Sequence, residues 1–210
     1  GLEDAREIAQ ATPRLEAISF GAGDYSAAME MPVGTIGAPD HSYGMTVTDE
    51  AGQRTGFHPA DKFHYATARL ANVCRAFGLR PIDSAYADFR DGAGYRAACQ
   101  RALALGYEGK FYIHPSQVAI ANEVFAPDAT AVAQARALVT AVDAATQAGQ
   151  GAATHQGQMV DLANLRLARS VLTRAQAIAE RTGADTEVKG AGNEGKEGHE
   201  EIVASTAGPL

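Results

Sequence analysis

The stretch LEAISFGAGD at residues 15–24 decides the fold class. Its apolar run, residues 15–20, is followed at once by glycines and an aspartate, which is typical of a buried strand that turns into a loop. Two more short strands are expected, over residues 80–86 and 110–113, and each ends in polar residues before a helical pattern. Alternation of strand, loop and helix predicts an α/β fold with a parallel sheet and right-handed crossovers.

Helical periodicity surrounds these strands. Residues 5–9 have the spacing of a helix that ends near Thr12-Pro13, because proline forbids its continuation. Apolar residues repeat with helical spacing from Pro59 to Gly78 and again around residues 94–105. Beyond the third strand, helices are expected at residues 116–125, 129–147 and 162–181. The chain therefore ends in helices, which we interpret as a cap or lid.

Two segments lack a clear period. Residues 31–58 form a long irregular stretch rich in Gly, Pro, Asp and His, and loops of this length are usually functional or disordered. Residues 186–210 have no aromatic residue, so they are expected to bury too little apolar surface to offset the entropy of ordering. We predict three regions: residues 1–125, a helical lid at 126–182, and a disordered tail at 183–210.

Composition narrows the class of function. The 210 residues are 46% hydrophobic and 20% charged with a net charge of -7, as in a soluble globular protein. Lys and Arg are scattered among acids, which argues against nucleic-acid binding and favours a small-molecule partner. No apolar run approaches the roughly 20 residues of a membrane span. No signal pattern follows Gly1, so any targeting segment would lie upstream of it, and the expected location is the cytoplasm. Cys74 and Cys99 lack metal-ligand spacing and are expected to be reduced structural thiols.

Two architectures fit this pattern. One is a small open doubly wound sheet, and the other is the last part of a (β/α)8 barrel, whose complete form needs about 250 residues. Against the open sheet, the first visible element is a helix with no strand before it. No G-x-G-x-x-G loop stands between a strand and a helix either. Periodicity alone does not choose between the two.

Five sequence elements follow one another along the chain: GLEDAREIA at 1–9, FGAGDY at 20–25, PID and DFRD at 81–91, GYEGK and IHPSQ at 106–117, and GQGA and QGQMVD at 149–161. Their order and separations resemble the CoA-ester lyases of the HpcH/HpaI aldolase type, which include the citrate lyase β-subunit, malyl-CoA lyase and citramalyl-CoA lyase. Gly23 departs from the Glu or Pro common in that family. The long segment 31–58 is more similar to the malyl-CoA lyases than to the short citrate lyase β-subunits.

The resemblance implies a TIM barrel of which this chain holds the last three βα units plus a helical C-terminal lid. It implies Mg2+-dependent, reversible Claisen-type cleavage of a β-hydroxyacyl-CoA into an acyl-CoA and a small α-keto acid. Malyl-CoA or β-methylmalyl-CoA, giving glyoxylate, is the first expectation because of the long segment 31–58. Citramalyl-CoA lyase and malyl-CoA thioesterase are alternatives on the same site. A truncated, non-catalytic partner subunit is the alternative of another class.

Two carboxylates are the main candidates for chemistry. Asp24 follows the first strand, where barrel enzymes place catalytic groups, and the resemblance implies that it ligates Mg2+. The second metal carboxylate is expected in a glutamate just before Gly1. The resemblance implies that Asp161 is the acid/base group, carried on a lid that reaches a neighbouring subunit of a homo-trimer or homo-hexamer. The structural alternative is that each aspartate caps the element that follows it.

Several other residues are weaker candidates. The backbone N–H groups of Gly21, Ala22 and Gly23 could bind a substrate carboxylate, although a plain tight turn explains the glycines equally well. His114 follows the third strand and is a candidate for substrate binding, while a structural histidine is the favoured interpretation. The loop residues His41, Tyr43 and His58 could shape an acyl pocket, and we interpret Asp83, Asp88 and Asp91 as structural.

Overall fold

A three-stranded parallel sheet forms the centre of the protein. The structure, a computed structural model, describes residues 1–32, 34–38, 40, 42–148, 153–155 and 158–183. The strands are β1 (Ala17–Ser19), β4 (Arg80–Asp83) and β5 (Gly109–Lys110), in the order β1-β4-β5. Ile18 pairs with Pro81, and Ile82 pairs with Gly109. The predicted mixed α/β fold with a parallel sheet is therefore confirmed, although β5 is shorter than expected and begins one residue earlier.

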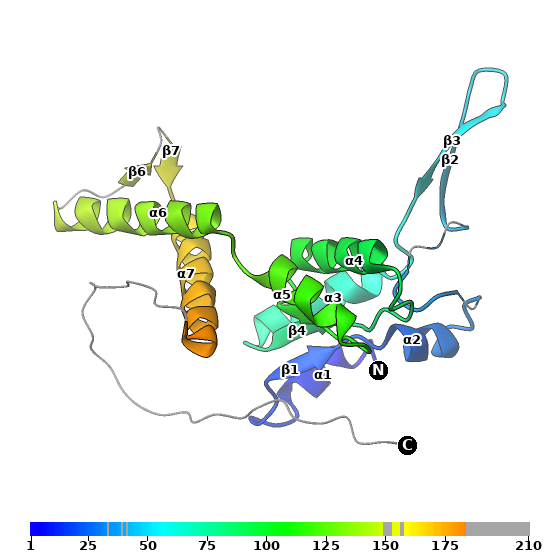
Figure 1. Ribbon diagram of the computed structural model, residues 1–210, viewed down its shortest axis with the longest axis horizontal. Coiled ribbons are helices and arrows are strands. Elements are labelled where there is room, and N and C mark those ends of the chain that lie inside the picture. Colours follow the sequence, from blue (N-terminus) through cyan, green and yellow to red (C-terminus); the bar gives the residue numbers. More distant parts are fainter. Residues whose placement is uncertain (33, 39, 41, 149–152, 156–157, 184–210) are drawn as a thin grey trace.

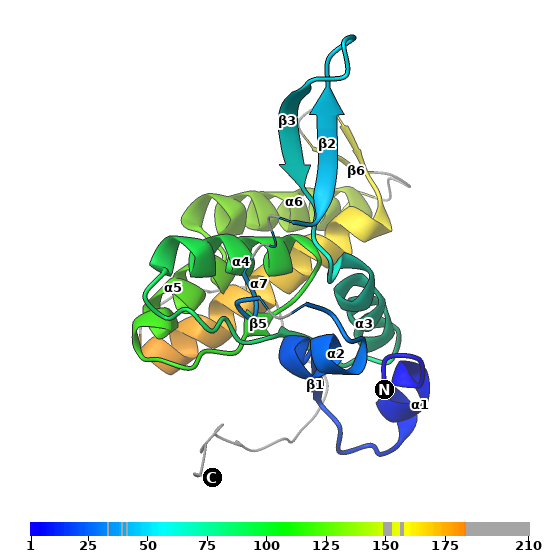
Figure 2. The ribbon, with the colours of Figure 1, turned by 90° about the vertical axis from the view of Figure 1, so that its right-hand side faces the viewer.

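Five helices accompany the sheet: α1 (Ala5–Gln10), α2 (Ala22–Ala28), α3 (His64–Ala76), α4 (Gly92–Ala104) and α5 (Ser116–Phe125). Helices α3 and α4 both end shortly before a glycine with positive φ, Gly78 at 71° and Gly106 at 88°. Glycine readily adopts the left-handed conformation that ends a helix. Figures 1 and 2 show α3 and α4 beside the short strands. The βα order thus follows the sequence pattern closely.

The apolar core has two parts. One surrounds Phe20, Phe63 and Leu70, and the other surrounds Tyr86, Tyr95 and other buried side chains of α4 and the loops beside it. Both cysteines, Cys74 and Cys99, are buried and free, as expected of structural thiols. None of the helices within the described ranges has both the length and the hydrophobicity of a membrane-spanning segment.

The segment 31–58 is not irregular throughout, and that prediction was wrong in part. It contains most of an antiparallel hairpin, β2 (Gly44–Thr48) and β3 (Arg54–Pro59), which projects from the rest of the protein in both views (Figures 1 and 2). Strand β2 alternates Thr with Met45 and Val47, a short period-2 pattern hidden by the surrounding Gly and Asp. Asp49 closes the turn by accepting hydrogen bonds from the backbone of Ala51 and Gln53.

The C-terminal region contains two helices in contact, α6 (Ala129–Gln147) and α7 (Leu162–Thr182), at the bounds that periodicity predicted to within one residue. A short hairpin that periodicity did not predict, β6 (Ala153–His155) and β7 (Gln158–Val160), lies between them. Gly183 has a φ of 65° and ends α7. Residues 149–152 and 156–157 of the predicted lid motif and residues 184–210 of the predicted tail lie outside the described residues, so the three-region division stays a prediction.

Candidate active site at the carboxyl ends of the parallel strands

Asp24 lies at the carboxyl end of β1, in the first turn of α2. Gly21 is the residue that precedes this helix, and a Cβ atom there would lie 2.8 Å from Asp24 Oδ2. The absent side chain at position 21 is therefore what lets the Asp24 carboxylate fold back over the strand end. Tyr25 packs against Phe20 and Phe63, with ring centroids 5.3 and 6.3 Å away, and holds the turn to the core. Asp24 itself stays exposed.

The glycine-rich turn leads directly into a helix. Tyr25 N–H makes the first intrahelical hydrogen bond, to Gly21 O at 2.9 Å. The N–H groups of Ala22, Gly23 and Asp24 precede it and belong to the first turn, where helices leave donors without intrahelical partners. Ala22 is buried, whereas Gly21 is exposed, so the turn presents only part of its backbone to solvent. A tight turn and a candidate donor set therefore coexist here.

A segment of the long loop crosses the same edge of the sheet. Ile36 Cδ1 lies 3.2 Å from where a Cβ on Gly23 would be, and Ile36 O accepts a hydrogen bond from Ala87 N–H at 2.9 Å. Gly37 has a φ of 82°, and a Cβ there would lie 2.6 Å from Ala85 O. Residues 34–38 thus bridge the loop after β1 and the loop after β4.

The strand ends of β4 and β5 carry a buried ion pair that the sequence did not reveal. Lys110 Nζ donates to Asp83 Oδ2 at 2.7 Å and to Ser84 O at 2.6 Å, and the Lys110 side chain is fully buried. The sequence predicted a structural role for Asp83 and no particular role for Lys110. The available signal was a charged residue at the end of each of two neighbouring strands. Since the two charges are paired with each other and out of solvent, they hold the strand ends together and do not face a substrate.

The loop after β4 is held by a second polar contact, which is partly buried. Tyr86 O–H donates to Asp91 Oδ2 at 2.7 Å, and Asp91 Oδ1 accepts from Gly94 N–H at 2.8 Å, which caps α4. Burial, together with the hydrogen bond to Asp91, raises the pKa of Tyr86 to about 12. Asp88 accepts a hydrogen bond from Arg90 N–H within the same loop. Asp88 and Asp91 therefore have structural partners.

His114 lies just after β5, on the same edge of the sheet as Asp24. Its Nδ1 accepts a hydrogen bond from Ser116 N–H at 3.2 Å and lies 2.9 Å from Ser116 Oγ, at the start of α5. The imidazole also stacks on Phe89, with centroids 4.6 Å apart and planes 21° apart. These contacts agree with a local structural role. The ring is exposed and therefore accessible at the rim, by which we mean the edge of the sheet formed by the carboxyl ends of β1, β4 and β5.

The structure does not bring Asp161 close to Asp24 within one chain. Asp161 is the N-cap of α7: its Oδ1 accepts from Asn164 N–H at 2.7 Å, and its own N–H donates to Asn164 Oδ1 at 3.2 Å. Figure 1 shows α7 beginning on the opposite side of the molecule from α2. Asp161 is exposed, so its carboxylate is open to another molecule.

The residues at the rim satisfy only part of a metal site. Mg2+ prefers six oxygen ligands, which in enzymes include one or two carboxylates. Asp24 offers one exposed carboxylate of this kind. Within the described ranges no group of three or more His, Cys, Asp or Glu side chains is placed to hold a metal ion. The loop residues Tyr43 and His58 lie on the projecting hairpin, and His41 lies outside the described residues.

Known proteins are similar to this chain over most of its length. The L-malyl-CoA/beta-methylmalyl-CoA lyase of Cereibacter sphaeroides is 41% identical over 179 residues, which cover 85% of this chain and 54% of that protein. The mitochondrial citramalyl-CoA lyase of Homo sapiens is 39% identical over 117 residues, covering 56% of this chain and 34% of that protein. The chain spans about half the length of the first of these relatives.

A solved structure has a similar fold. The crystal structure of CitE from Mycobacterium tuberculosis in complex with magnesium, acetoacetate and coenzyme A aligns with a TM-score of 0.59 and 27% identity. The alignment covers 84% of this chain and 57% of that one. Residues 1–115, which include β1, β4, β5 and the rim described above, match the family described as HpcH/HpaI aldolase/citrate lyase. This chain therefore belongs to the HpcH/HpaI aldolase/citrate lyase family.

Proposed function

We propose that this chain is part of a CoA-ester lyase that cleaves malyl-CoA or β-methylmalyl-CoA, reversibly and with Mg2+, into an acyl-CoA and glyoxylate. The observation that carries the proposal is the exposed Asp24 carboxylate at the carboxyl end of β1, within a chain 41% identical to a lyase of that name. We propose further that β1, β4 and β5 with their helices are the last three βα units of a TIM barrel. Active sites in such barrels lie at the carboxyl ends of the strands.

The residues of this chain have separate tasks in the proposed reaction. Asp24 would hold Mg2+ from one side, and the ion when bound supplies stabilisation of developing negative charge on oxygen. A further carboxylate from outside residues 1–210 would complete the metal site. The N–H groups at Gly21, Ala22 and Gly23 would bind the carboxylate of the keto acid. His114 on the same rim is a weaker candidate for substrate contact.

Asp161 would move the proton. In the cleavage direction Asp161 would accept the proton of the substrate hydroxyl group as the C–C bond breaks, and it would then return this proton to the α-carbon of the acyl-CoA enolate. Since α7 begins far from α2 in one chain, we propose that Asp161 reaches the rim of a neighbouring copy in a homo-trimer or homo-hexamer. The exposure of Asp161 supports such a reach.

The test combines two neutralising substitutions with matched controls in the full-length enzyme. Asp24→Asn should abolish turnover of malyl-CoA with Mg2+, whereas Glu7→Gln, in the first turn of α1, should not. Asp161→Asn should lower turnover by at least about a hundredfold, since proton transfer contributes about that much or more. Asp128→Asn is its control, because Asp128 caps α6 with the same contact. Full activity of Asp24→Asn would end the proposal.

Citramalyl-CoA is the second candidate substrate, favoured by the 39% identity to the human citramalyl-CoA lyase. Assays that measure free CoA together with glyoxylate and pyruvate separate the possibilities. A malyl-CoA lyase releases glyoxylate, a citramalyl-CoA lyase releases pyruvate, and a thioesterase releases CoA with neither keto acid. If the chain is instead a non-catalytic partner subunit, none of these products should form, even though Asp24 and Asp161 are present.

A further inference from the structure

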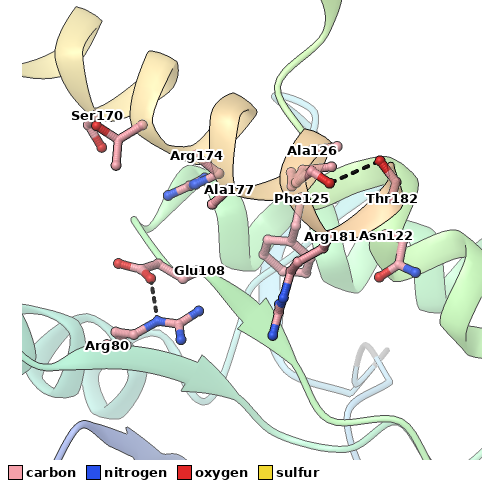
Figure 3. Close-up of a pocket in the computed structure, with 12 residues that line it drawn as sticks. Arg80, Glu108, Asn122, Phe125, Ala126, Ser170, Arg174, Ala177, Arg181 and Thr182 are labelled. Atoms are coloured by element: carbon pink, nitrogen blue, oxygen red, sulfur yellow. Dashed lines mark hydrogen bonds and ion pairs between the residues drawn. The ribbon is translucent and has the colours of Figure 1, made fainter. Parts of the chain in front are cut away.

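A cavity of about 820 Å³ lies at the edge of the sheet opposite Asp24 (Figure 3). Its walls are one face of α7, the end of α5, and the residues Arg80 and Glu108 at the amino ends of β4 and β5. Because the strands are parallel, their amino ends and the rim with Asp24 are on opposite edges. The volume lies in the range of small-molecule sites, and nothing in the proposed lyase reaction uses this space.

The cavity has more positive than negative charge. Its lining includes Arg80, Arg174 and Arg181, and Glu108 is its single acidic residue. Glu108 is already occupied, because it accepts hydrogen bonds from Arg80 Nε at 2.7 Å and from Arg75 on α3. Neither Arg174 nor Arg181 forms an ion pair with any residue that the structure describes. The uncompensated charge therefore comes from α7.

The donors on α7 share one face. Arg174 and Arg181 are seven residues apart, which is about two turns and roughly 10 Å along the helix. Figure 3 shows both on the face of α7 turned toward Arg80 and Glu108. Ser170 and Thr173 add hydroxyl groups to the same wall, and Ser170 is one turn before Arg174. Guanidinium groups bind phosphate through two parallel hydrogen bonds, and phosphate oxygens can accept from neighbouring hydroxyls as well.

We propose that this cavity binds a phosphate-bearing small molecule through Arg174 and Arg181, at a site separate from the rim. Apolar contacts would come from Phe125 and Ile178, which also line the cavity. A carboxylate ligand would use the guanidinium groups but offers fewer oxygens to the hydroxyl groups beside them. The proposal does not depend on the lyase activity.

Calorimetric titration of the full-length enzyme with inorganic phosphate at low ionic strength tests the site. Arg174→Gln and Arg181→Gln should each weaken phosphate binding by roughly tenfold or more, because each removes a charge-assisted hydrogen bond. Arg166→Gln and Arg169→Gln are the matched controls: both residues are exposed on α7, and neither lines the cavity. Asp24→Asn should bind phosphate as the unmodified chain does, so this test and that of the lyase can fail independently.

Two further ligands decide the chemical class and the source of the phosphate. If adenosine 3′,5′-bisphosphate binds more tightly than inorganic phosphate and depends on Arg181 in the same way, the ligand is a nucleotide. If the two bind equally well, the site recognises a free phosphate group. Absence of phosphate binding, equal losses in the Arg166 and Arg169 variants, or preference for malonate would each overturn the proposal. Circular dichroism checks that Arg181→Gln keeps α7 folded, and Arg174→Lys, which keeps the charge, should bind better than Arg174→Gln.

Discussion

Lys110 and Asp83 form an ion pair inside the protein, at the carboxyl ends of β5 and β4. The Nζ–Oδ2 distance is 2.7 Å, and the exposed fractions of the two side chains are 0% and 6%. The residues are also register partners in the sheet, so their side chains leave it on the same face. Lys110 donates to Ser84 O as well, so the first residue of the loop after β4 is held by the same ammonium group. The pair therefore links strand register to the shape of the rim.

Removing one member of this pair should be strongly destabilising. Lys110→Met leaves the Asp83 carboxylate buried without a partner, which typically costs about 3–5 kcal/mol of unfolding free energy. Urea unfolding followed by circular dichroism measures the loss. Arg96→Met is the control: the Arg96–Glu123 pair is 39% and 66% exposed, and such pairs contribute about 1 kcal/mol or less. If Lys110→Met lowers the unfolding free energy no more than Arg96→Met does, the burial argument is contradicted. The double variant Asp83→Leu/Lys110→Met should lose less unfolding free energy than Lys110→Met alone, because no unpaired charge stays buried.

Gly37 and Gly52 allow backbone strain to be separated from steric conflict. Both have positive φ, at 82° and 78°, so alanine at either position meets the left-handed penalty of about 1–2 kcal/mol. Only at Gly37 would the new Cβ meet a backbone atom, Ala85 O at 2.6 Å, whereas Gly52 faces open space. Gly37→Ala should therefore lower the unfolding free energy more than Gly52→Ala does. Equal losses by chemical denaturation would show that residues 34–38 do not press on the loop after β4.

Glu108 should make stability depend on pH in the acid range. Burial raises its pKa, but hydrogen bonds from Arg80 and Arg75 outweigh burial and hold the pKa below its ordinary value of 4.5. A depressed carboxyl pKa contributes stability above the unfolded-state value, and this contribution is lost as the pH falls through the folded-state value. Glu108→Gln should therefore flatten the fall in urea midpoint below about pH 4.5.

The control for this pH effect is Glu123→Gln. Arg96 also lowers the pKa of Glu123, but the Glu123 side chain is 66% exposed and solvent screens the pair. Its substitution should change the acid slope less than Glu108→Gln does. An acid slope that is the same in Glu108→Gln and the unmodified protein would show that the cluster of Arg75, Arg80 and Glu108 carries no folding free energy.

Asp161 can be tested as a helix cap apart from any catalytic role. Asp161→Ala removes the acceptor for Asn164 N–H and should cost about 1 kcal/mol, whereas Asp161→Asn keeps a cap oxygen and should be nearly neutral. Thermal unfolding by circular dichroism compares the two. A chain destabilised equally by Asn and Ala would mean that the negative charge at this helix start, and not the hydrogen bond, stabilises α7.

Local patterns predicted the regular elements where the period was unbroken. The bounds of α5 and α6 agree with the expected ranges because their apolar residues repeat without interruption. The hairpin β2–β3 was missed, since its alternation is short and is surrounded by turn-forming residues. The cap at Asp161 was foreseen from its place before a periodic run, and the contacts of the structure agree with it.

The sequence by itself determined the α/β order, the parallel sheet, the family, and which carboxylates to consider, because these depend on residues near one another in the chain or on matching motifs. Tertiary structure alone decided that Asp24 folds over Gly21, that Lys110 meets Asp83, and that α7 faces Glu108 across a cavity. Those contacts join residues that are separated in sequence or depend on side-chain direction. No local period encodes them, because they arise only when the strands pair and the helices pack.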